Sequence, residues 1–450
     1  MEEDITGITS PSFSLTKKME KIKGRLEEAI ERAQEKLNYE SAHDEDIRRS
    51  LEIVSDFIKR KQRVCYGGTA MNAILPASKK FYDYDFDLPD YDFYTPDGNG
   101  DIEELAKELK AAGFKDVHHR LGIHEGTKKI MVNFVAVADV TQIDRDLFNI
   151  FLRRSIVKEG VHYTDPDILR MMMYLELSRP KGQVDRWEKV FDRLQLINNS
   201  FPVKATKSCR AGTEPLPRHA YYAVLNYIIE NERILCNGPI IPIYTKGIKK
   251  GKAYYDVRPG GPMLFTSPAA KEDAIQLKKL IEHKEDGEYP VKIYLHKARG
   301  ELVPERYELQ SGGKVVCSIV NEVACHSYNV VPLKDGRVVY IASLEFLITL
   351  YLSLHIFTTR SNDILGDNVM CQVGKFIALA FDNYYSSKSQ FPAFSLNCRG
   401  HQTGYASLIR KKVLRIKLEK GEGAKPKAAT KKKGATKKKR KTARKKKKAD

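Results

Sequence analysis

Between residues 64 and 140, short apolar runs alternate with turns and with one helix, and this pattern constrains the fold more than any other feature. The helix is predicted at Asp101–Ala112, where acidic residues form the first turn and Gly113 ends it. Runs rich in β-branched and aromatic residues lie on both sides of this helix. Strands interleaved with a helix predict a mixed α/β (α+β) fold.

Longer helical segments flank this region. Residues 16–60 predict two helices, because apolar residues recur on one stripe at Ile22, Leu26, Ile30 and Ala33 and again at Ile47, Leu51, Val54 and Ile58. Residues 171–196 predict helix again, with an interruption near Pro180. Residues 202–410 mix strand-like and helix-like runs, which predicts a second α/β domain.

The positive charge is concentrated at the C-terminal end. The formal net charge is +19, and residues 421–450 hold 15 of the 77 basic residues but only 2 of the 58 acidic ones. The preceding 420 residues, with 62 basic and 56 acidic residues, are therefore only mildly basic, and a hydrophobic content of 42% is enough to build cores. We expect a disordered tail that binds RNA phosphates, acts as a nuclear localisation signal or only keeps the chain soluble.

The cysteines, the first residues and the most apolar stretch indicate where in the cell the protein is expected. Seven cysteines occur without a C-x-x-C pair, so we expect reduced thiols, with Cys325 in the core, and an intracellular protein. The first residues are acidic and predict no secretory signal. The most apolar stretch, residues 338–357, contains polar groups at helical spacing, which predicts a buried helix and no membrane span.

The first chemical motif is Tyr66-Gly67-Gly68-Thr69-Ala70-Met71-Asn72, which follows the apolar pair Val64-Cys65. Two glycines let the backbone approach an anion closely, and the residues after them are expected to open a helix whose N–H groups face phosphates. Thr69 adds a hydroxyl donor, and Pro76 is expected to end the helix after two turns. Taken alone, a Gly-Gly pair usually marks only a tight turn.

The second motif is an Asp-x-Asp pair in Leu88-Pro-Asp90-Tyr-Asp92-Phe-Tyr94. In a strand, Asp90 and Asp92 share one face and the aromatic residues pack on the other. Two neighbouring carboxylates repel each other unless a cation neutralises them, and Mg²⁺ is the natural partner of oxygen ligands. Upstream, Asp83, Asp85 and Asp87 form a competing run in the opposite register; we favour Asp90 and Asp92 because a turn and a helix follow them directly.

The third motif is the apolar run Met131–Val140, which contains Asp139 near its end. We expect one central strand that delivers this carboxylate to the edge of the sheet. A lone aspartate at a strand end more often begins a turn. After the Asp-x-Asp pair, however, it supplies a third ligand, and three carboxylates are able to hold two cations about 4 Å apart for an in-line phosphoryl or nucleotidyl displacement.

Together these motifs resemble those of the polymerase-β-like nucleotidyltransferase superfamily. Their residues are most similar to the motifs of the poly(A) polymerase catalytic subunits of large nucleocytoplasmic DNA viruses. Besides the three motifs, the resemblance uses His124-Glu-Gly-Thr127, Ala138-Asp-Val-Thr141 and the run Leu169–Pro180, and it covers about residues 60–200. Thr69 stands where the superfamily usually has serine, which keeps the hydroxyl. The gap from Gly68 to Asp90 is wider than in most members but similar to that of the viral group.

The resemblance implies a template-independent polynucleotide adenylyltransferase that adds AMP from ATP to the 3′ end of mRNA. It implies that Gly67, Gly68 and Thr69 bind the ATP triphosphate, and that Asp90, Asp92 and Asp139 bind two Mg²⁺ or Mn²⁺ ions and carry the catalysis. It also implies a homodimer or a separate viral processivity subunit, and a location in the host cytoplasm, viral factory or virion.

The expected organisation is therefore an N-terminal helical arm (residues 1–60), a catalytic nucleotidyltransferase domain (61–200), a second α/β domain forming the other wall of an RNA cleft or a dimer wall (201–412), and the basic tail (421–450). Two alternatives stay open: a nucleotidyltransferase with another acceptor, and a non-catalytic RNA-binding or processivity protein on the same fold. Four cations after the catalytic motifs are further candidates for nucleotide contacts, although charges on helices are usually only solvated: Arg170, Arg179, Arg186 and Lys189.

Overall fold

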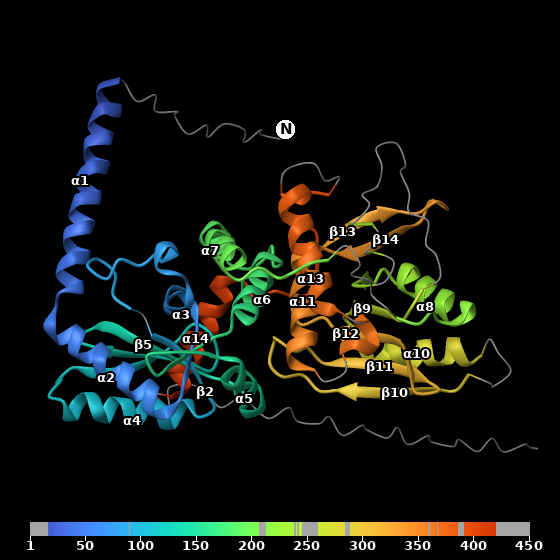
Figure 1. Ribbon diagram of the computed structural model, residues 1–450, viewed down its shortest axis with the longest axis horizontal. Helices are drawn as coiled ribbons and strands as arrows, with labels where there is room; N and C mark the ends of the chain where they lie inside the picture. Colours follow the sequence, from blue (N-terminus) through green and yellow to red (C-terminus); the bar gives the residue numbers. More distant parts are fainter. Residues whose placement is uncertain are drawn as a thin grey trace, which may run out of the picture.

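The structure, a computed structural model, is an elongated molecule with a mixed sheet at each end and helices between them (Figure 1). It describes residues 17–89, 91–206, 213–237, 240, 243–244, 260–283, 289–358, 361–366, 368–385 and 391–419. The predicted basic tail and Asp90 lie outside these described residues.

The N-terminal sheet has seven strands in the order β3-β4-β5-β2-β1-β7-β6. Its strands are β1 (Val64–Cys65), β2 (Tyr91–Thr95), β3 (Val117–Leu121), β4 (Thr127–Val132), β5 (Val135–Gln142), β6 (Ile156–Lys158) and β7 (Val161–Tyr163). Strands β2 and β5 run parallel at its centre, and β1 pairs antiparallel with β2. This sheet and the second one described below confirm the mixed α/β fold class.

Seven helices accompany this sheet, and their ends follow local capping chemistry. They are α1 (Lys17–Ala42), α2 (Glu45–Lys61), α3 (Gly67–Ile74), α4 (Gly98–Ala111), α5 (Arg145–Arg154), α6 (Pro166–Leu177) and α7 (Trp187–Ser200). Asp44 caps α2 by accepting a hydrogen bond of 2.9 Å from the Ile47 N–H. Helix α3 ends just before Pro76, as predicted.

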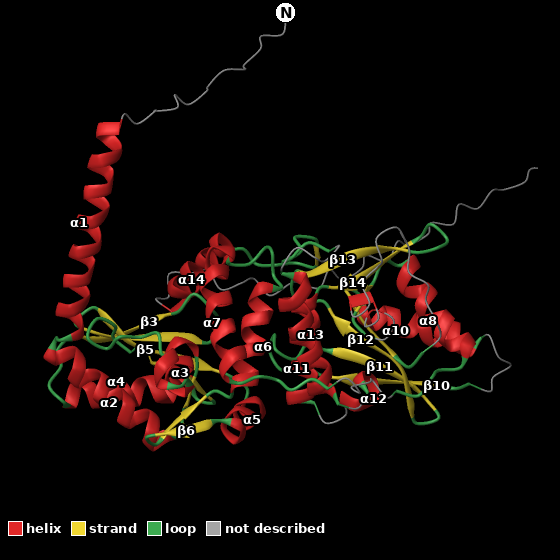
Figure 2. Ribbon diagram, turned by 45° about the horizontal axis from the view of Figure 1, so that its top comes forward, coloured by secondary structure: helices red, strands yellow, loops and turns green. Residues whose placement is uncertain are grey.

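Helix α1 projects away from the body of the molecule (Figures 1 and 2). The predicted apolar stripe is present but exposed: Ile22, Leu26 and Ile30 are each more than half exposed. The equivalent stripe on α2 behaves differently, because Ile47, Leu51, Val54 and Ile58 are buried against the sheet. The periodicity therefore predicted both helices but not which of the two stripes would be covered within the chain.

One sequence prediction was wrong. The run Met131–Val140 is not a single strand, because Asn133 and Phe134 form a tight turn between β4 and β5 with φ values of 48° and 65°. Two successive residues in the left-handed region are typical of a two-residue hairpin, and asparagine tolerates that conformation. The exposed Phe134 side chain made the run look continuously apolar. Asp139 still lies near the end of the second strand, β5.

The C-terminal sheet has eight strands in the order β10-β11-β12-β9-β8-β14-β13-β15. They are β8 (Ile234–Leu235), β9 (Met263–Ser267), β10 (Val291–His296), β11 (Arg306–Ser311), β12 (Lys314–Asn321), β13 (His326–Pro332), β14 (Val338–Ala342) and β15 (Cys398–Arg399). The helices of this part are α8 (Arg218–Glu230), α10 (Ala270–Glu282), α11 (Leu344–Phe357), α12 (Ser361–Leu365), α13 (Val369–Leu379) and α14 (Tyr405–Glu419).

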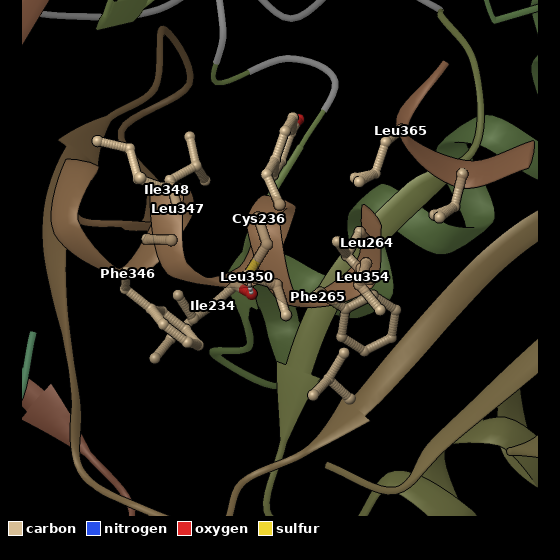
Figure 3. Packing of buried hydrophobic residues seen from close by; sticks show 14 of the residues in the cluster. Ile234, Cys236, Leu264, Phe265, Phe346, Leu347, Ile348, Leu350, Leu354 and Leu365 are labelled. Carbon is tan, nitrogen blue, oxygen red and sulfur yellow. Dashed lines mark hydrogen bonds between the residues drawn. The ribbon is translucent and has the colours of Figure 1, made fainter. Parts of the chain in front are cut away.

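Helix α11 is the centre of the larger core. Ser343 caps it, and nearly every one of its residues is buried, as expected for a helix that is apolar on all sides. Its side chains, including Phe346, Leu350 and Leu354, belong to the same core cluster as Leu264 and Phe265 of β9 (Figure 3). Helix α11 also contacts α6 and α13, so the core continues from the C-terminal sheet into the helices that border the N-terminal sheet.

The cysteine prediction needs a correction. Cys325 and Cys398 form a disulfide with a Cα–Cα distance of 5.3 Å, next to the pairing of β13 with β15. The two residues are 73 positions apart, so no local spacing signals the bond. Cys65, Cys236 and Cys317 are buried free thiols, and Cys209 lies outside the described residues.

Glu345 in α11 predicts a pH dependence of stability. Its side chain is fully buried, and burial raises the pKa of its carboxyl group to about 7. The folded chain therefore holds this proton more tightly than the unfolded chain, and stability falls as pH rises from about 4.5 to about 7. We expect Glu345→Gln to stabilise the protein more at about pH 8 than at about pH 5, by roughly 2 kcal/mol.

Urea denaturation at the two pH values measures this difference. Glu103→Gln is the matched control, because Glu103 is an exposed glutamate of α4. An equal change at both pH values for Glu345→Gln would contradict the assignment.

Candidate active site

A cavity of about 600 Å³ lies between the N-terminal sheet and helices α6 and α7. It brings together residues from three of the predicted motifs, which are far apart in the sequence. Of the predicted site residues, five line this cavity: Gly67, Gly68, Thr69, Asp92 and Asp139. Their roles in binding and catalysis stay predictions, but their convergence is a property of the fold.

The turn at the start of α3 lies directly against Asp92. Gly67 has a φ of 73°, and a Cβ atom added to it would lie 2.5 Å from Asp92 Oδ2. The Tyr66 N–H donates to the Asp92 backbone carbonyl at 2.8 Å, which fixes the strand beside the turn. Only glycine fits here, because the backbone is left-handed and a carboxylate occupies the space of a side chain.

Asp92 and Asp139 are direct neighbours on adjacent parallel strands. They are register partners in the β2–β5 pair, so both side chains lie on the same face of the sheet. The opposite face of β2 is apolar: Phe93 is fully buried in the core. The predicted alternation is therefore confirmed for Asp92 and Phe93. Asp90, which would share the face of Asp92, lies outside the described residues.

Lys129 of β4 balances part of this negative charge. Its Nζ atom lies 2.7 Å from each carboxylate oxygen of Asp139, whose side chain is only 14% exposed. Nearby, the Tyr66 hydroxyl hydrogen-bonds Thr141 Oγ1 at 2.9 Å, and burial together with the neighbouring Tyr94 and Asp92 raises the pKa of Tyr66. Tyr66 is therefore a neutral phenol that supports the floor of the cavity.

The opposite wall is strongly basic. Arg179, Arg186, Lys189 and Arg193 line the cavity across from the acidic strands. The charge of Arg193, with burial and the charge of Arg186, lowers the pKa of Lys189. Arg193 also lies beside the glycine turn, since a Cβ atom on Gly68 would be 3.1 Å from its Nη1 atom. Its guanidinium lies 4.8 Å from the Phe81 ring centroid, and Nη2 donates to the Tyr82 hydroxyl at 3.3 Å.

The chain's C-terminal segment completes the cavity. Gln402, Thr403 and Leu408 line it, and α14 lies against the N-terminal sheet although it is the last described helix (Figures 1 and 2). Arg415 holds α14 in place by donating to the backbone carbonyls of Gly122, Ile123 and His124, with distances of 3.3, 2.8 and 3.2 Å.

The structure separates the other candidates. Asp83, Asp85 and Asp87 do not line this cavity: they form an exposed turn in which the Asp83 N–H donates to Asp87 Oδ2 at 2.9 Å. Arg170 is fully buried and donates to Asn198 Oδ1 at 2.7 Å, so it supports the fold rather than the cavity.

The sequence analysis did not predict Arg193 as a residue of the cavity, although its spacing from two predicted residues would have indicated it. Arg186, Lys189 and Arg193 are three and four positions apart, which places them on one helical face. The contributions of Tyr82 and Gln402 had no such signal, because each comes from a separate loop.

The donor set fits a hard divalent cation. Two carboxylates lie side by side in a half-buried cavity, and Mg²⁺ is usually bound by one or two protein carboxylates together with substrate phosphates. Among the residues that the structure describes, no group of three or more acidic, histidine or cysteine side chains is placed to hold a metal ion. Asp90, the third predicted carboxylate ligand, lies outside the described residues.

The fold is shared with a viral enzyme of known structure. The crystal structure of the Megavirus polyadenylate synthase matches with a TM-score of 0.71 over 94% of this chain and 87% of that one, at 19% sequence identity. At this identity the match shows the fold alone. It confirms the predicted fold class, a mixed α/β protein.

The sequence comparisons define the family resemblance. Residues 52–183 match the family model described as Poly(A) polymerase catalytic subunit. A protein of Acanthamoeba polyphaga mimivirus, provisionally named poly(A) polymerase catalytic subunit, is 33% identical over 159 residues, or 34% of this chain and 26% of its own length. A protein of African swine fever virus (isolate Tick/Malawi/Lil 20-1/1983) with the same provisional name is 27% identical over 210 residues, or 43% and 44%.

The resemblance to viral poly(A) polymerase catalytic subunits is therefore confirmed for the segment that carries the motifs. The matched segments span about a quarter to less than half of the length of these relatives. A membrane-crossing helix would need a long apolar stretch, and none of the described helices provides one.

The contact of Gly67 with Asp92 gives a testable consequence. We expect Gly67→Ala to destabilise the protein by about 1 kcal/mol for the left-handed backbone and by a further 1–3 kcal/mol for the displaced carboxylate. Gly160→Ala is the control, because Gly160 has a similar φ of 81° and a Cβ atom there meets only Lys59 side-chain atoms at 3.7 Å. Equal losses in urea denaturation would contradict the close packing of Asp92 on the turn.

Proposed function

We propose that this chain is a template-independent polynucleotide adenylyltransferase that adds AMP from ATP to the 3′ end of RNA, mRNA above all, with Mg²⁺ or Mn²⁺. One observation carries the proposal: Asp92 and Asp139 lie side by side next to the Gly67-Gly68 turn and across from a basic wall in one cavity. Nucleotidyl transfer uses carboxylates that hold divalent cations next to a site for the phosphates, and an acidic pair beside a glycine turn provides this arrangement.

The acidic side of the cavity would hold the reacting groups. Bound divalent cations supply Lewis-acid activation of the primer 3′-hydroxyl and charge neutralisation of the leaving pyrophosphate. Asp92 and Asp139, with Asp90, would hold these cations, and the contact with Lys129 orients the Asp139 carboxylate. Geometry and charge would do nearly all the catalytic work, as is usual for phosphoryl transfer.

The basic side would bind the triphosphate. Gly67, Gly68 and Thr69 at the start of α3 line the same cavity as Lys189 and Arg193. A helix N-terminus and nearby cations together favour a polyanion. Arg193 is pre-positioned by the rings of Phe81 and Tyr82, so little side-chain entropy would be lost when phosphate binds.

Helix α14 supports a polynucleotide acceptor over a small molecule. It carries five basic residues and one acidic residue beside the cavity: Arg410, Lys411, Lys412, Arg415, Lys417 and Glu419. Such a helix would attract the phosphates of an RNA strand whose 3′ end enters the cavity. A non-catalytic RNA-binding protein would have no need for two adjacent carboxylates, since they repel RNA.

An extension assay tests the proposal. Purified protein with an oligo(A) primer, Mg²⁺ and each nucleoside triphosphate in turn should extend the primer with ATP. We expect Asp92→Asn to reduce extension by about 100-fold or more, because one carboxylate that binds the reacting charges is lost. Asp56→Asn is the control, since Asp56 is an exposed acid of α2. Incorporation that needs no primer would favour another acceptor, and RNA binding without any incorporation would favour the non-catalytic reading.

We also propose that the partner of this chain is a second copy, bound through α1. The apolar stripe of this projecting helix is 46–58% exposed at Met19, Ile22, Leu26, Ile30 and Leu37. Residues 17–25 hold five basic residues and one acidic residue, whereas residues 26–42 hold five acidic and two basic residues. Two antiparallel copies of α1 would cover both stripes and place each basic half beside an acidic half.

Charge variants test this pairing. We expect Lys21→Glu/Lys23→Glu/Arg25→Glu to sediment as a monomer, because each acidic half then faces another acidic half. Glu27→Lys/Glu31→Lys/Glu35→Lys should be monomeric for the same reason with the signs reversed. A mixture of the two variants should dimerise again. A wild-type chain that sediments as a monomer, or a mixture that stays monomeric, would contradict the pairing and favour a separate processivity protein.

A further inference from the structure

A second, larger cavity of about 1000 Å³ lies at the junction of the two sheets, away from the acidic pair. It is formed by α5 on one side and by β10, β11 and the end of α11 on the other. Helix α5 lies at the edge of the N-terminal part that faces the C-terminal sheet (Figures 1 and 2). The two parts of the fold thus build this cavity jointly.

The lining has an excess of positive charge. Its cations are Arg153, Arg154, Lys297, Arg299 and Arg306, and its acids are Asp144, Asp146 and Glu308. Two of the acids are already engaged within the protein. Asp144 accepts hydrogen bonds of 2.9 and 3.2 Å from the first N–H groups of α5, and Glu308 lies 3.0 Å from Arg306 Nη1.

Two of the cations are also engaged, since Arg306 is paired with Glu308 and Arg154 lies 3.3 Å from Asp165 and 3.7 Å from Asp167. The other three have spare capacity. Arg153, Lys297 and Arg299 form no ion pair with any acid in the described part of the chain. Arg306 is only 3% exposed, and its Nε atom has no hydrogen-bond partner among the described residues; the same holds for Nε of Arg154. These two atoms are closed to solvent, so a ligand in the cavity would instead meet the exposed side chains of Arg153 and Lys297 and the half-buried Arg299.

The cavity also offers an aromatic surface. Tyr294 lines it and is 44% exposed, whereas Phe357 at the inner end is buried. Exposed aromatic rings interleaved with cations are typical of surfaces that bind single-stranded nucleic acid, in which bases stack and phosphates pair with cations.

A single turn connects this cavity with the candidate active site. Arg299, Val303 and Pro304 line the larger cavity, whereas Leu302 lines the smaller one. Glu301, in the same turn, lies 2.9 Å from Arg179 of the basic wall. The turn is closed by a hydrogen bond of 2.8 Å from the Arg299 N–H to the Val303 carbonyl. A strand that leaves the active site past Leu302 would therefore reach the second cavity directly.

We propose that this second cavity binds the phosphodiester backbone of single-stranded RNA upstream of the 3′ end that occupies the active site. The proposal rests on the proposed function for the direction of the strand. Binding itself is independent of catalysis, and so it is tested without nucleotide.

The test uses the full-length chain and fluorescent oligo(A) with a blocked 3′ end. The variant is Arg153→Gln/Lys297→Gln/Arg299→Gln. The matched control, Lys107→Gln/Lys115→Gln/Lys271→Gln, removes the same charge from exposed lysines that line neither cavity. For an oligomer of about 20 nucleotides we expect the variant to bind about tenfold more weakly, and the salt dependence of log K to fall by about 2, since each lost phosphate contact removes about 0.7. An oligomer of about 4 nucleotides should bind both proteins alike, because it fills only the active site.

Several outcomes would overturn the proposal. One is equal affinity of the variant and the control for the longer oligomer. Another is an equal loss for inorganic tripolyphosphate, which would assign the cavity to free polyphosphate instead of RNA. Tyr294→Leu gives a second measurement that leaves the charge unchanged, and we expect it to weaken binding of the longer oligomer about fivefold or more. Asp92→Asn should abolish extension and keep RNA affinity, so failure of the catalytic proposal is distinguishable from failure of this one.

Discussion

The repulsion between two carboxylates organises this structure. Asp92 and Asp139 are register partners on adjacent parallel strands, in a cavity where water screens charge only partly. Positively charged groups nearby compensate for that repulsion. Lys129 contacts Asp139, and the basic residues of α7 line the same cavity. A site built in this way is poised to take up further positive charge, which is why a divalent cation and a nucleotide triphosphate fit it together.

The cavity depends on contacts between segments that are distant in the sequence. The glycine turn comes from the start of α3 and the acidic strands from the N-terminal sheet. The basic wall comes from α7 and the segment between α6 and α7, and the last wall from the segment that leads into α14. Helix α6 packs on α11, so the large core of the C-terminal part sets the position of the basic wall. The chain's own core thus holds opposite charges on two sides of one cavity, and the same junction forms the second basic cavity near α5.

Local chemistry explains which elements the sequence predicted well. The start of α2 at Asp44, the end of α3 before Pro76 and the buried helix after Ser343 each follow from a cap, a proline or an all-round apolar pattern within a few residues. The strand before β5 was misjudged for the opposite reason. Asn133 and Phe134 form a turn whose signal, a left-handed backbone, is invisible in a run of apolar letters. The disulfide between Cys325 and Cys398 was likewise beyond local spacing, because it joins segments 73 residues apart.

The sequence by itself determined which residue types and local motifs form the candidate site: a glycine turn, acids that alternate with buried aromatics, and a further acid near a strand end. These are properties of residues within a few positions of one another, where periodicity and backbone sterics act. Only the tertiary structure decided that Asp92 and Asp139 are neighbours, that Arg193 joins the basic wall while Arg170 is buried, and that Gln402 returns to close the cavity. Those relations depend on how two sheets and their helices pack, and packing is set by the whole core.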